Sequence, residues 1–355
     1  MTKPVPQITE MHCSGWHDQP LRTPKATPRP SRSERHTRPR TAYQSCGGFL
    51  TREPAALCAG ARRTDAPLTG YPMQPGKLYA CSESDYRAFP AANYSTLKAG
   101  RESALAMKWA IDTPRESTEA MDLGRAVEDM AFGSHDSVVV APDVDRRTKV
   151  GKAEWATFHA ANAGKIVLTA DAYADAYTMH ARLSANPDAV ALTRAAKFRQ
   201  AVAVWVDEAT GVTCKARIDA LTPGVCLTDL KTTRAALDDR SLGAEVARMG
   251  YHIQAAFYSD GFKACTGIDT PFTLVCVQNR PPFDCVVKRL DDVAIEAGRK
   301  WYRHLLGVWK AGKETGIWPG FPAGIGTLEI PKWEVQAADR AEWRDAPASD
   351  DDHSF

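Results

Sequence analysis

The sequence predicts an α/β domain with a mixed central sheet flanked by helices. Two observations lead to this prediction. Segments with helical spacing of apolar residues come first, and they are followed by three strand-like segments, a helix, two more strands and a closing helix. The first three strands succeed one another directly and form a meander, whereas the later strands follow a long helix. With 355 residues, 44% of them hydrophobic, the chain can bury one sizeable core, alone or with an appendage.

The predicted helices before the sheet carry apolar residues at helical spacing or are rich in alanine. They span residues 95–111, 121–132, 152–163 and 169–185. In the last of them Thr169 supplies a side-chain cap at the start, and Asn186-Pro187 marks the end because the residue before a proline disfavours the helical region.

The predicted strands alternate between apolar and polar side chains, as Val202, Val204 and Val206 do in the first one. They span residues 198–207, 212–221, 225–231, 272–278 and 285–290. Pro223-Gly224 is a hairpin turn signal between the second and third strands. Helices at 241–264 and 293–310 complete the domain.

The two ends of the chain differ from its middle in composition. Residues 1–70 hold eleven Lys or Arg against five acids, a balance of +6 in a chain of net charge +2. Residues 19–40 are rich in Pro, Arg, Ser and Thr and lack apolar periodicity, so this arm cannot fold alone. It is either a nucleic-acid-binding arm or a dispensable extension before a start nearer Met73. The predicted divisions are a disordered basic arm at 1–75, a folded domain at 76–335 and an acidic flexible tail at 336–355.

Composition also bounds the compartment and the cofactors. No apolar run approaches the roughly 18 residues of a membrane span, and the first residues lack an apolar signal core, so we expect a cytoplasmic protein without a membrane partner. The nine cysteines contain no Cys-x-x-Cys pair, which favours reduced thiols in core strands over disulfides, zinc or an iron–sulfur cluster. No phosphate-binding loop of an ATP-driven helicase occurs.

The predicted hairpin carries the most informative side chains. Asp229 and Lys231 stand two residues apart on one strand and so share a face, and the turn can bring Asp219 beside them. Carboxylates packed this closely repel one another unless a divalent cation neutralises them, and oxygen ligands suit magnesium or manganese. Taken alone, however, such a pattern is more often a surface ion pair on a solvated hairpin, here between Asp229 and Lys231.

Two helices add candidates to this hairpin. Gln254 and Tyr258 lie four residues apart, on one face of the helix that follows the hairpin, and this face can look back at Asp229 and Lys231. Glu128 sits on an earlier helix among apolar neighbours, which indicates an acid that reaches inward. The alternatives are a packing role for Tyr258 and solvated positions for Gln254 and Glu128.

In this order and on these elements, the residues resemble the PD-(D/E)xK nuclease superfamily, whose core is restriction-endonuclease-like. The resemblance covers residues 79–333. More specifically, four segments are similar to the exonuclease VIII (RecE-type) exodeoxyribonucleases of phages and prophages: Lys215-Ala-Arg-x-Asp219, Asp229-Leu-Lys-Thr-Thr233, Tyr251-His-x-Gln-Ala-Ala-Phe-Tyr258 and Val277-x-x-x-Pro-Pro282. The joint match is much more specific than any of its parts.

The resemblance implies roles for these residues. Asp219, Asp229 and Glu128 would be metal ligands together with the Leu230 carbonyl, for one or two Mg²⁺ or Mn²⁺ ions. Lys231 would orient the attacking water and steady the charge on phosphorus. The resemblance also implies that Gln254 and Tyr258 line the site.

The sequence departs from the family pattern at two positions. Ile218 stands where relatives have proline before the first acid, a backbone preference of small consequence. Glu128 stands where exonuclease VIII relatives commonly have histidine, although lambda-type exonucleases use an acid there, so the metal preference stays open. His252 is a DNA contact, an active-site contact or, as is commoner for a lone helical histidine, a structural residue.

The resemblance further implies a reaction and partners. The expected activity is hydrolysis of linear double-stranded DNA from its ends, 5′ to 3′, which yields single strands for phage-type recombination. A single-strand annealing protein of the RecT type and a ring-shaped homo-oligomer are the expected partner and assembly. The alternatives are a nuclease of the Cas4 or AddB type, whose four cluster-binding cysteines have no counterpart here, an endonuclease, or an inactive DNA-binding relative.

Overall fold

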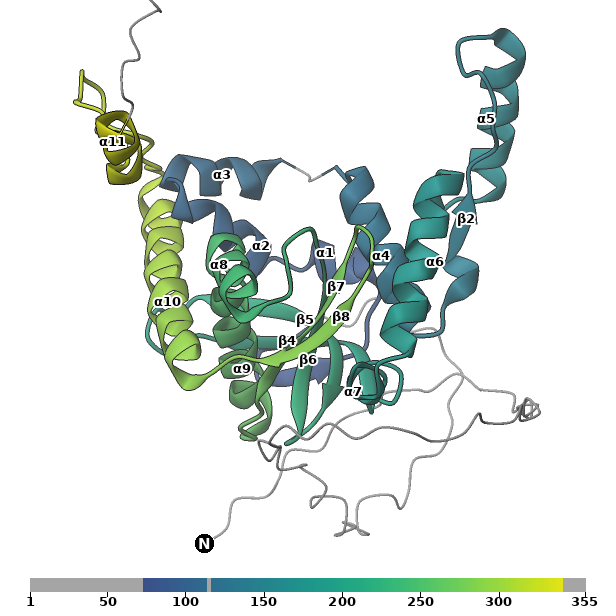
Figure 1. Ribbon diagram of the computed structural model, residues 1–355. Coiled ribbons are helices and arrows are strands. Elements are labelled where there is room, and N and C mark those ends of the chain that lie inside the picture. Colours follow the sequence, from purple (N-terminus) through teal and green to yellow (C-terminus); the bar gives the residue numbers. More distant parts are fainter. Residues whose placement is uncertain (1–72, 114–115, 341–355) are drawn as a thin grey trace, which may run out of the picture.

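The computed structural model describes residues 73–113 and 116–340. Residues 1–72 of the expected basic arm lie outside these ranges, and so do residues 341–355 of the expected acidic tail. The described chain contains a six-stranded sheet, a small two-stranded sheet and helices around them (Figure 1).

The six-stranded sheet is mixed, as predicted. Its order is β1-β4-β5-β6-β7-β8, and every neighbouring pair is antiparallel except β6 and β7, which run parallel. The strands are β1 (Lys77–Tyr79), β4 (Phe198–Val206), β5 (Thr213–Thr222), β6 (Cys226–Thr233), β7 (Phe272–Gln278) and β8 (Cys285–Arg289). The sequence did not predict β1, which has only three residues.

The parallel pair requires a crossover, and two helices provide it. They are α8 (Asp239–Met249) and α9 (Tyr251–Thr266). The prediction of a single helix over residues 241–264 is therefore wrong. Gly250 separates the two helices with a φ of 74°, in the left-handed region that favours glycine, and it is both the C-cap of α8 and the N-cap of α9.

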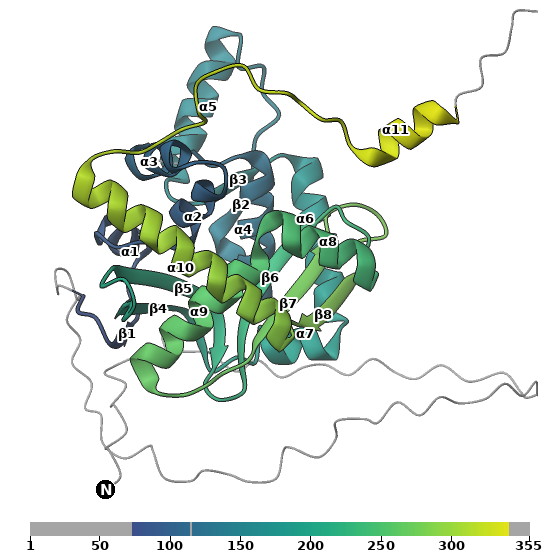
Figure 2. The same ribbon diagram turned by 90° about the vertical axis from the view of Figure 1, so that its left-hand side faces the viewer.

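Helices cover both faces of the sheet (Figures 1 and 2). On one face, α9 and α10 (Asp292–Thr315) pack over the first core cluster, which contains Phe257, Phe262, Ile218 and Leu274. On the other face, α4 (Glu119–Ala131) and α6 (Ala170–Ser184) pack over a second cluster around Met130, Met179 and Leu230. The sheet thus separates two cores, and its strands have buried residues on both faces.

The helix predicted over residues 95–111 is also divided. Its parts are α2 (Tyr94–Leu97), a 3₁₀ turn (Lys98–Arg101) and α3 (Ala104–Asp112). Ser103 starts the last part, because its hydroxyl accepts a hydrogen bond from the Ala106 N–H at 3.0 Å. A local cap signal therefore overrode the apolar spacing on which the prediction rested.

The remaining helices frame this body. Thr169 caps α6 as predicted, and Asn186-Pro187 ends it but also begins another helix, with proline at its first position. Pairing of two three-residue strands forms the small parallel sheet. The helices and strands not yet named are α1 (Glu83–Ala88), a 3₁₀ turn (His135–Ser137), β2 (Val138–Val140), α5 (Lys149–Ala161), β3 (Ile166–Leu168), α7 (Pro187–Leu192) and α11 (Lys332–Asp339).

Two of these helices stand away from the body. Helix α5 extends beyond α6, and α11 lies at the end of a long stretch without regular structure (Figures 1 and 2). Helix α11 crosses residue 336, where we expected the folded domain to end. No helix in the described residues is long and apolar enough to cross a membrane. The six cysteines in these ranges are free thiols, four of them in strands β5 to β8.

Candidate active site

The candidate site lies where strands β5 and β6 part. Their ladder pairs Ala220–Thr222 with Cys226–Thr228, and it stops before Asp219 and Asp229. Beyond this point the Leu230 N–H donates a hydrogen bond to Asp219 Oδ2 at 3.1 Å. The hairpin prediction is therefore confirmed: the turn brings Asp219 beside the strand that carries Asp229.

Asp229 is held from two directions. Its side chain is only 3% exposed, and its Oδ2 forms an ion pair with Lys231 Nζ at 2.5 Å. Its Oδ1 accepts a hydrogen bond from Gln254 Nε2 of α9 at 2.7 Å. The prediction that this face of α9 looks back at the strand is confirmed. A buried ion pair with a second, uncharged donor fixes the carboxylate in one orientation.

Two tyrosines of α9 surround this pair. The Lys231 Nζ lies 4.9 Å from the centre of the Tyr251 ring, in cation–π contact. Tyr258 is 9% exposed, and its ring packs edge-on against Phe272. Burial and the nearby phenol and carboxylates raise the pKa of Tyr258 well above its usual value, and a side-chain hydrogen bond with Gln254 opposes this shift. Gln254 thus joins Tyr258 to Asp229.

Glu128 approaches from the other face of the sheet. It is half-buried on α4, and it accepts a hydrogen bond from the Gln200 side-chain amide of β4. Gln200 has a φ of 52°, in the region where non-glycine residues are uncommon. The β4–β5 register pairs Arg199 with Ala220 and Ala201 with Ile218, so Gln200 and Asp219 both lie between these two pairs. The Gln200 Oε1 is buried and has no hydrogen-bond partner among the described residues. A strained backbone at this point is typical of a functional site.

The carboxylates act on one another electrostatically. Burial, followed by Glu128 and Asp229, raises the pKa of Asp219 well above its usual value. Burial also raises the pKa of Glu128 to about 7, with Asp229 adding to the rise and Arg217 opposing it. For Lys231, burial alone would lower the pKa, but Asp229 and Asp219 raise it above its usual value. The lysine is thus held as a cation among acids that repel one another.

A divalent cation fits the chemistry of this set. Among the described residues no three His, Cys, Asp or Glu side chains are gathered closely enough to hold a metal ion. Each of the three carboxylates contacts a protein donor instead. Their oxygen-only donors suit Mg²⁺ or Mn²⁺, and a cation would cancel their repulsion. Asp219, Asp229 and Glu128 would hold the ion, and the Leu230 carbonyl remains a predicted ligand.

Two residues of the family-like segments have structural roles. Lys215 is 3% exposed, and its Nζ donates to the carbonyls of Tyr86 and Phe89, each at 2.5 Å, at the end of α1. Burial lowers its pKa to about 8. His252 is half-buried, with Nδ1 3.4 Å from the Val246 carbonyl oxygen, so it connects α9 to α8. This contact agrees with the structural alternative for His252.

The sequence did not identify Gln200 as a site residue, nor the charged residues Glu83, Arg125 and Arg217 near Glu128. The alternation that marks Val202, Val204 and Val206 extends back to Gln200, and this signal could have placed its side chain on the face of Asp219. Glu83 had no such signal, because its contacts with Arg125 and Arg217 join segments far apart in the chain.

Comparisons with known proteins agree with this fold. Residues 84–325 match the family described as "PDDEXK-like domain of unknown function (DUF3799)", so the chain belongs to that family. Among solved structures, it is similar to a 2.19 Å crystal structure titled "Putative exonuclease" from Eubacterium rectale, with 14% sequence identity and a TM-score of 0.50. The similarity covers 73% of this chain and 99% of the other, and at this identity it shows the fold alone. A search of curated proteins found no match.

Proposed function

We propose that this chain is an exodeoxyribonuclease that depends on Mg²⁺ or Mn²⁺ and hydrolyses phosphodiester bonds of linear double-stranded DNA, 5′ to 3′. The observation that carries the proposal is the Asp229–Lys231 pair. It is buried, fixed by Gln254 and flanked by Asp219, with Glu128 close enough to shift the pKa of Asp219. A solvated surface ion pair would have none of these supports.

Each residue then has a task in the reaction. Water attacks phosphorus, and the bond to the 3′ oxygen breaks with a proton passing to that oxygen. A bound divalent cation would supply charge neutralisation for the phosphate and lower the pKa of water. Lys231, which is kept cationic by Asp229 and Asp219, would orient the water and steady charge on the phosphoryl oxygens. Gln254 would keep Asp229 in place, supported by Tyr258.

The decisive experiment uses linear duplex DNA carrying a fluorophore at one 3′ end, incubated with the purified protein in Mg²⁺ or Mn²⁺. We expect progressive shortening of the labelled strand, and none with Asp229→Asn. Immediate release of a labelled mononucleotide would reverse the proposed polarity. Absence of digestion in both metals would overturn the enzyme proposal in favour of an inactive DNA-binding relative.

A covalently closed circular duplex separates the proposal from the endonuclease alternative. The exonuclease leaves the circle intact, whereas cutting of circle and linear DNA at equal rates would contradict a requirement for ends. The proposal extends to a biological role, a partner and an assembly. The enzyme would generate single strands for recombination, work with an annealing protein of the RecT type and form a ring-shaped homo-oligomer. Light scattering of the purified protein tests the ring, and co-purification with an annealing protein tests the partner.

A further inference from the structure

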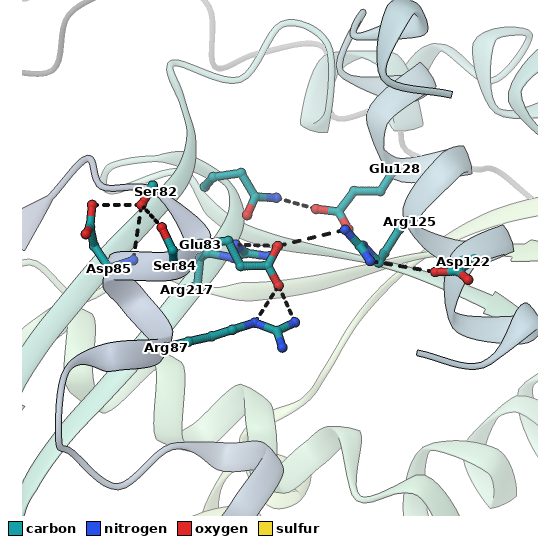
Figure 3. Close-up of polar contacts among 10 residues, drawn as sticks. Ser82, Glu83, Ser84, Asp85, Arg87, Asp122, Arg125, Glu128 and Arg217 are labelled. Atoms are coloured by element: carbon teal, nitrogen blue, oxygen red, sulfur yellow. Dashed lines mark hydrogen bonds and ion pairs between the residues drawn. The ribbon is translucent and has the colours of Figure 1, made fainter. Parts of the chain in front are cut away.

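A second charged cluster lies beside the candidate site, and Glu83 of α1 is its centre. One oxygen of Glu83, Oε1, accepts a hydrogen bond from Arg87 Nε at 2.8 Å. The other oxygen, Oε2, faces Arg217 of β5 at 3.5 Å and Arg125 of α4 at 4.0 Å. Figure 3 shows Glu83 reaching from α1 toward Arg125 on the opposite helix, with Glu128 of the same helix above Arg125 in this view.

The arginines are placed by the same elements that place the candidate ligands. Arg217 is two residues before Asp219, so both side chains lie on one face of β5, and its charge acts on Glu128. Arg125 is three residues before Glu128 on α4. Lys215 fixes α1 by binding its last carbonyls, and this contact keeps Glu83 in position. Two positive charges therefore border the site on the strand and the helix that carry its acids.

Glu83 is an accessible and exchangeable partner for these arginines. Its side chain is 34% exposed, those of Arg125 and Arg217 are 44% and 28% exposed, and Arg125 also lies 3.6 Å from Asp122. Although burial opposes ionisation, the three arginines lower the pKa of Glu83, so it remains a carboxylate. The guanidinium group binds phosphate with the geometry that it uses for carboxylate.

We propose that Arg125 and Arg217 form a binding site for a DNA phosphate beside the cutting site, and that Glu83 takes the place of this phosphate in the free protein. DNA must displace Glu83 to engage the two arginines. This inference rests on the proposed function for its ligand, which is either a backbone phosphate or the terminal 5′ phosphate of a DNA end. In the free protein Glu83 thus competes with the substrate, so DNA engages the arginines at a cost in affinity.

The test measures binding of a 30-base-pair fluorescent duplex to the full chain, in Ca²⁺ and at several salt concentrations. Arg125→Gln and Arg217→Gln are each expected to weaken binding about tenfold. Each is also expected to reduce the slope of log affinity against log salt by about 1. Glu83→Gln is expected to tighten binding about twofold to fivefold, because its carboxylate no longer competes. Lys263→Gln is the matched control, since Lys263 is an exposed cation at the far end of α9.

Two arms identify the phosphate. A loss confined to duplexes with a 5′ phosphate assigns the terminal group, and an equal loss with 5′-hydroxyl duplexes assigns the backbone. Wild-type affinity and salt slope in both arginine variants, or a wild-type protein that does not bind the duplex, would overturn the proposal. If binding depends on the arginines but the wild type does not cleave DNA in Mg²⁺, the proposed function is wrong and this inference stands. If both arginine variants cleave DNA as the wild type does, this inference is wrong and the proposed function stands. Glu83→Gln, which keeps size and polarity, stays informative if an arginine variant unfolds.

Discussion

The two sides of the site are built differently. On the α9 side, made of Asp229, Lys231, Tyr251, Gln254 and Tyr258, the contacts are buried, and the Asp229 side chain is 3% exposed. On the α1–α4 side, made of Glu83, Arg125, Glu128, Gln200 and Arg217, charged side chains are 28–44% exposed where ion pairs join them. Buried polar networks are rigid, whereas exposed ion pairs are weak and screened by salt. Under the proposed function, the α9 side is a preset half of the site, and the α1–α4 side is a responsive half whose ion pairs an anionic substrate would rearrange.

Removing the lysine should break the preset half most severely. We expect Lys231→Met to lower DNA cleavage roughly 10²- to 10³-fold, because the cation that steadies the phosphoryl charge is lost. The variant also leaves Asp229 buried without its counter-charge, at a cost of about 3–5 kcal/mol in stability. The double variant Asp229→Asn, Lys231→Met removes both charges and should fold better than Lys231→Met while staying inactive. Recovery of cleavage in the double variant would contradict the assigned roles.

Gly250 fixes the start of α9, so it should be the most sensitive backbone position on the preset side. A Cβ there would lie 2.7 Å from Tyr94 Oη and 2.9 Å from an Arg101 nitrogen, at a φ of 74°. We expect Gly250→Ala to lower the free energy of unfolding by about 2–3 kcal/mol, measured in urea. Gly243→Ala is the control, because its Cβ would enter open space in α8 and should raise stability by up to about 1 kcal/mol. Equal effects of the two changes would contradict this account of the helix break.

The two glutamines compare the sides directly. Gln254→Ala leaves the buried Asp229 Oδ1 without its donor, so we expect cleavage to fall about 10- to 100-fold. Gln200→Ala removes the amide that holds the half-buried Glu128, where water can replace it, and the loss should stay below about tenfold. Steady-state rates of both variants at saturating metal test this difference. A larger loss for Gln200→Ala would reverse the distinction between the sides.

The packing of α10 behind the preset half should depend on pH. Asp260 of α9 accepts hydrogen bonds from Arg299 at 2.7 and 2.8 Å and from Tyr302 at 2.6 Å. Although burial opposes this, these donors lower the pKa of Asp260 below its usual 3.8. Its stabilisation is therefore present above pH 3.8 and is lost as the pH falls through the lowered value.

Asp260→Asn removes this pH-dependent contribution. We expect the variant to be less stable than the wild type by about 1–2 kcal/mol at pH 7, with a difference that shrinks toward pH 3. Denaturation midpoints at both pH values measure it. A difference that is constant with pH would show that the ionised carboxylate is not the stabilising form.

The sequence revealed the preset half better than the responsive half. Asp219, Asp229 and Lys231 share one hairpin, and Gln254 and Tyr258 share one helix face, so local periodicity was enough to group them. The strands β4 to β8 were predicted for the same reason.

The contacts of the responsive half join distant segments. Glu128 and Gln200 are 72 residues apart in the sequence. Glu83 of α1 pairs with Arg217 of β5, which is also far along the chain. Only tertiary packing brings such pairs together. The break at Gly250 was missed because apolar spacing continues through it, and the decisive contact is made by Tyr94, whose hydroxyl donates to the Gly250 carbonyl at 2.6 Å. Long-range contacts of single polar groups leave no periodic signal in a sequence.

The central claim is that Asp219, Asp229 and Glu128 together form a divalent-cation site, and titration calorimetry of the purified protein with Mn²⁺ tests it most directly. We expect the wild type to bind Mn²⁺ with release of protons near pH 7, because the pKa of Glu128 is raised to about 7 and a bound cation favours its ionised form. Asp219→Asn, Asp229→Asn and Glu128→Gln should each weaken binding at least about tenfold, with Asp122→Asn, a half-buried acid in the first turn of α4, as the control. Wild-type protein that does not bind Mn²⁺, or three variants that bind it as tightly as the wild type, would contradict the claim.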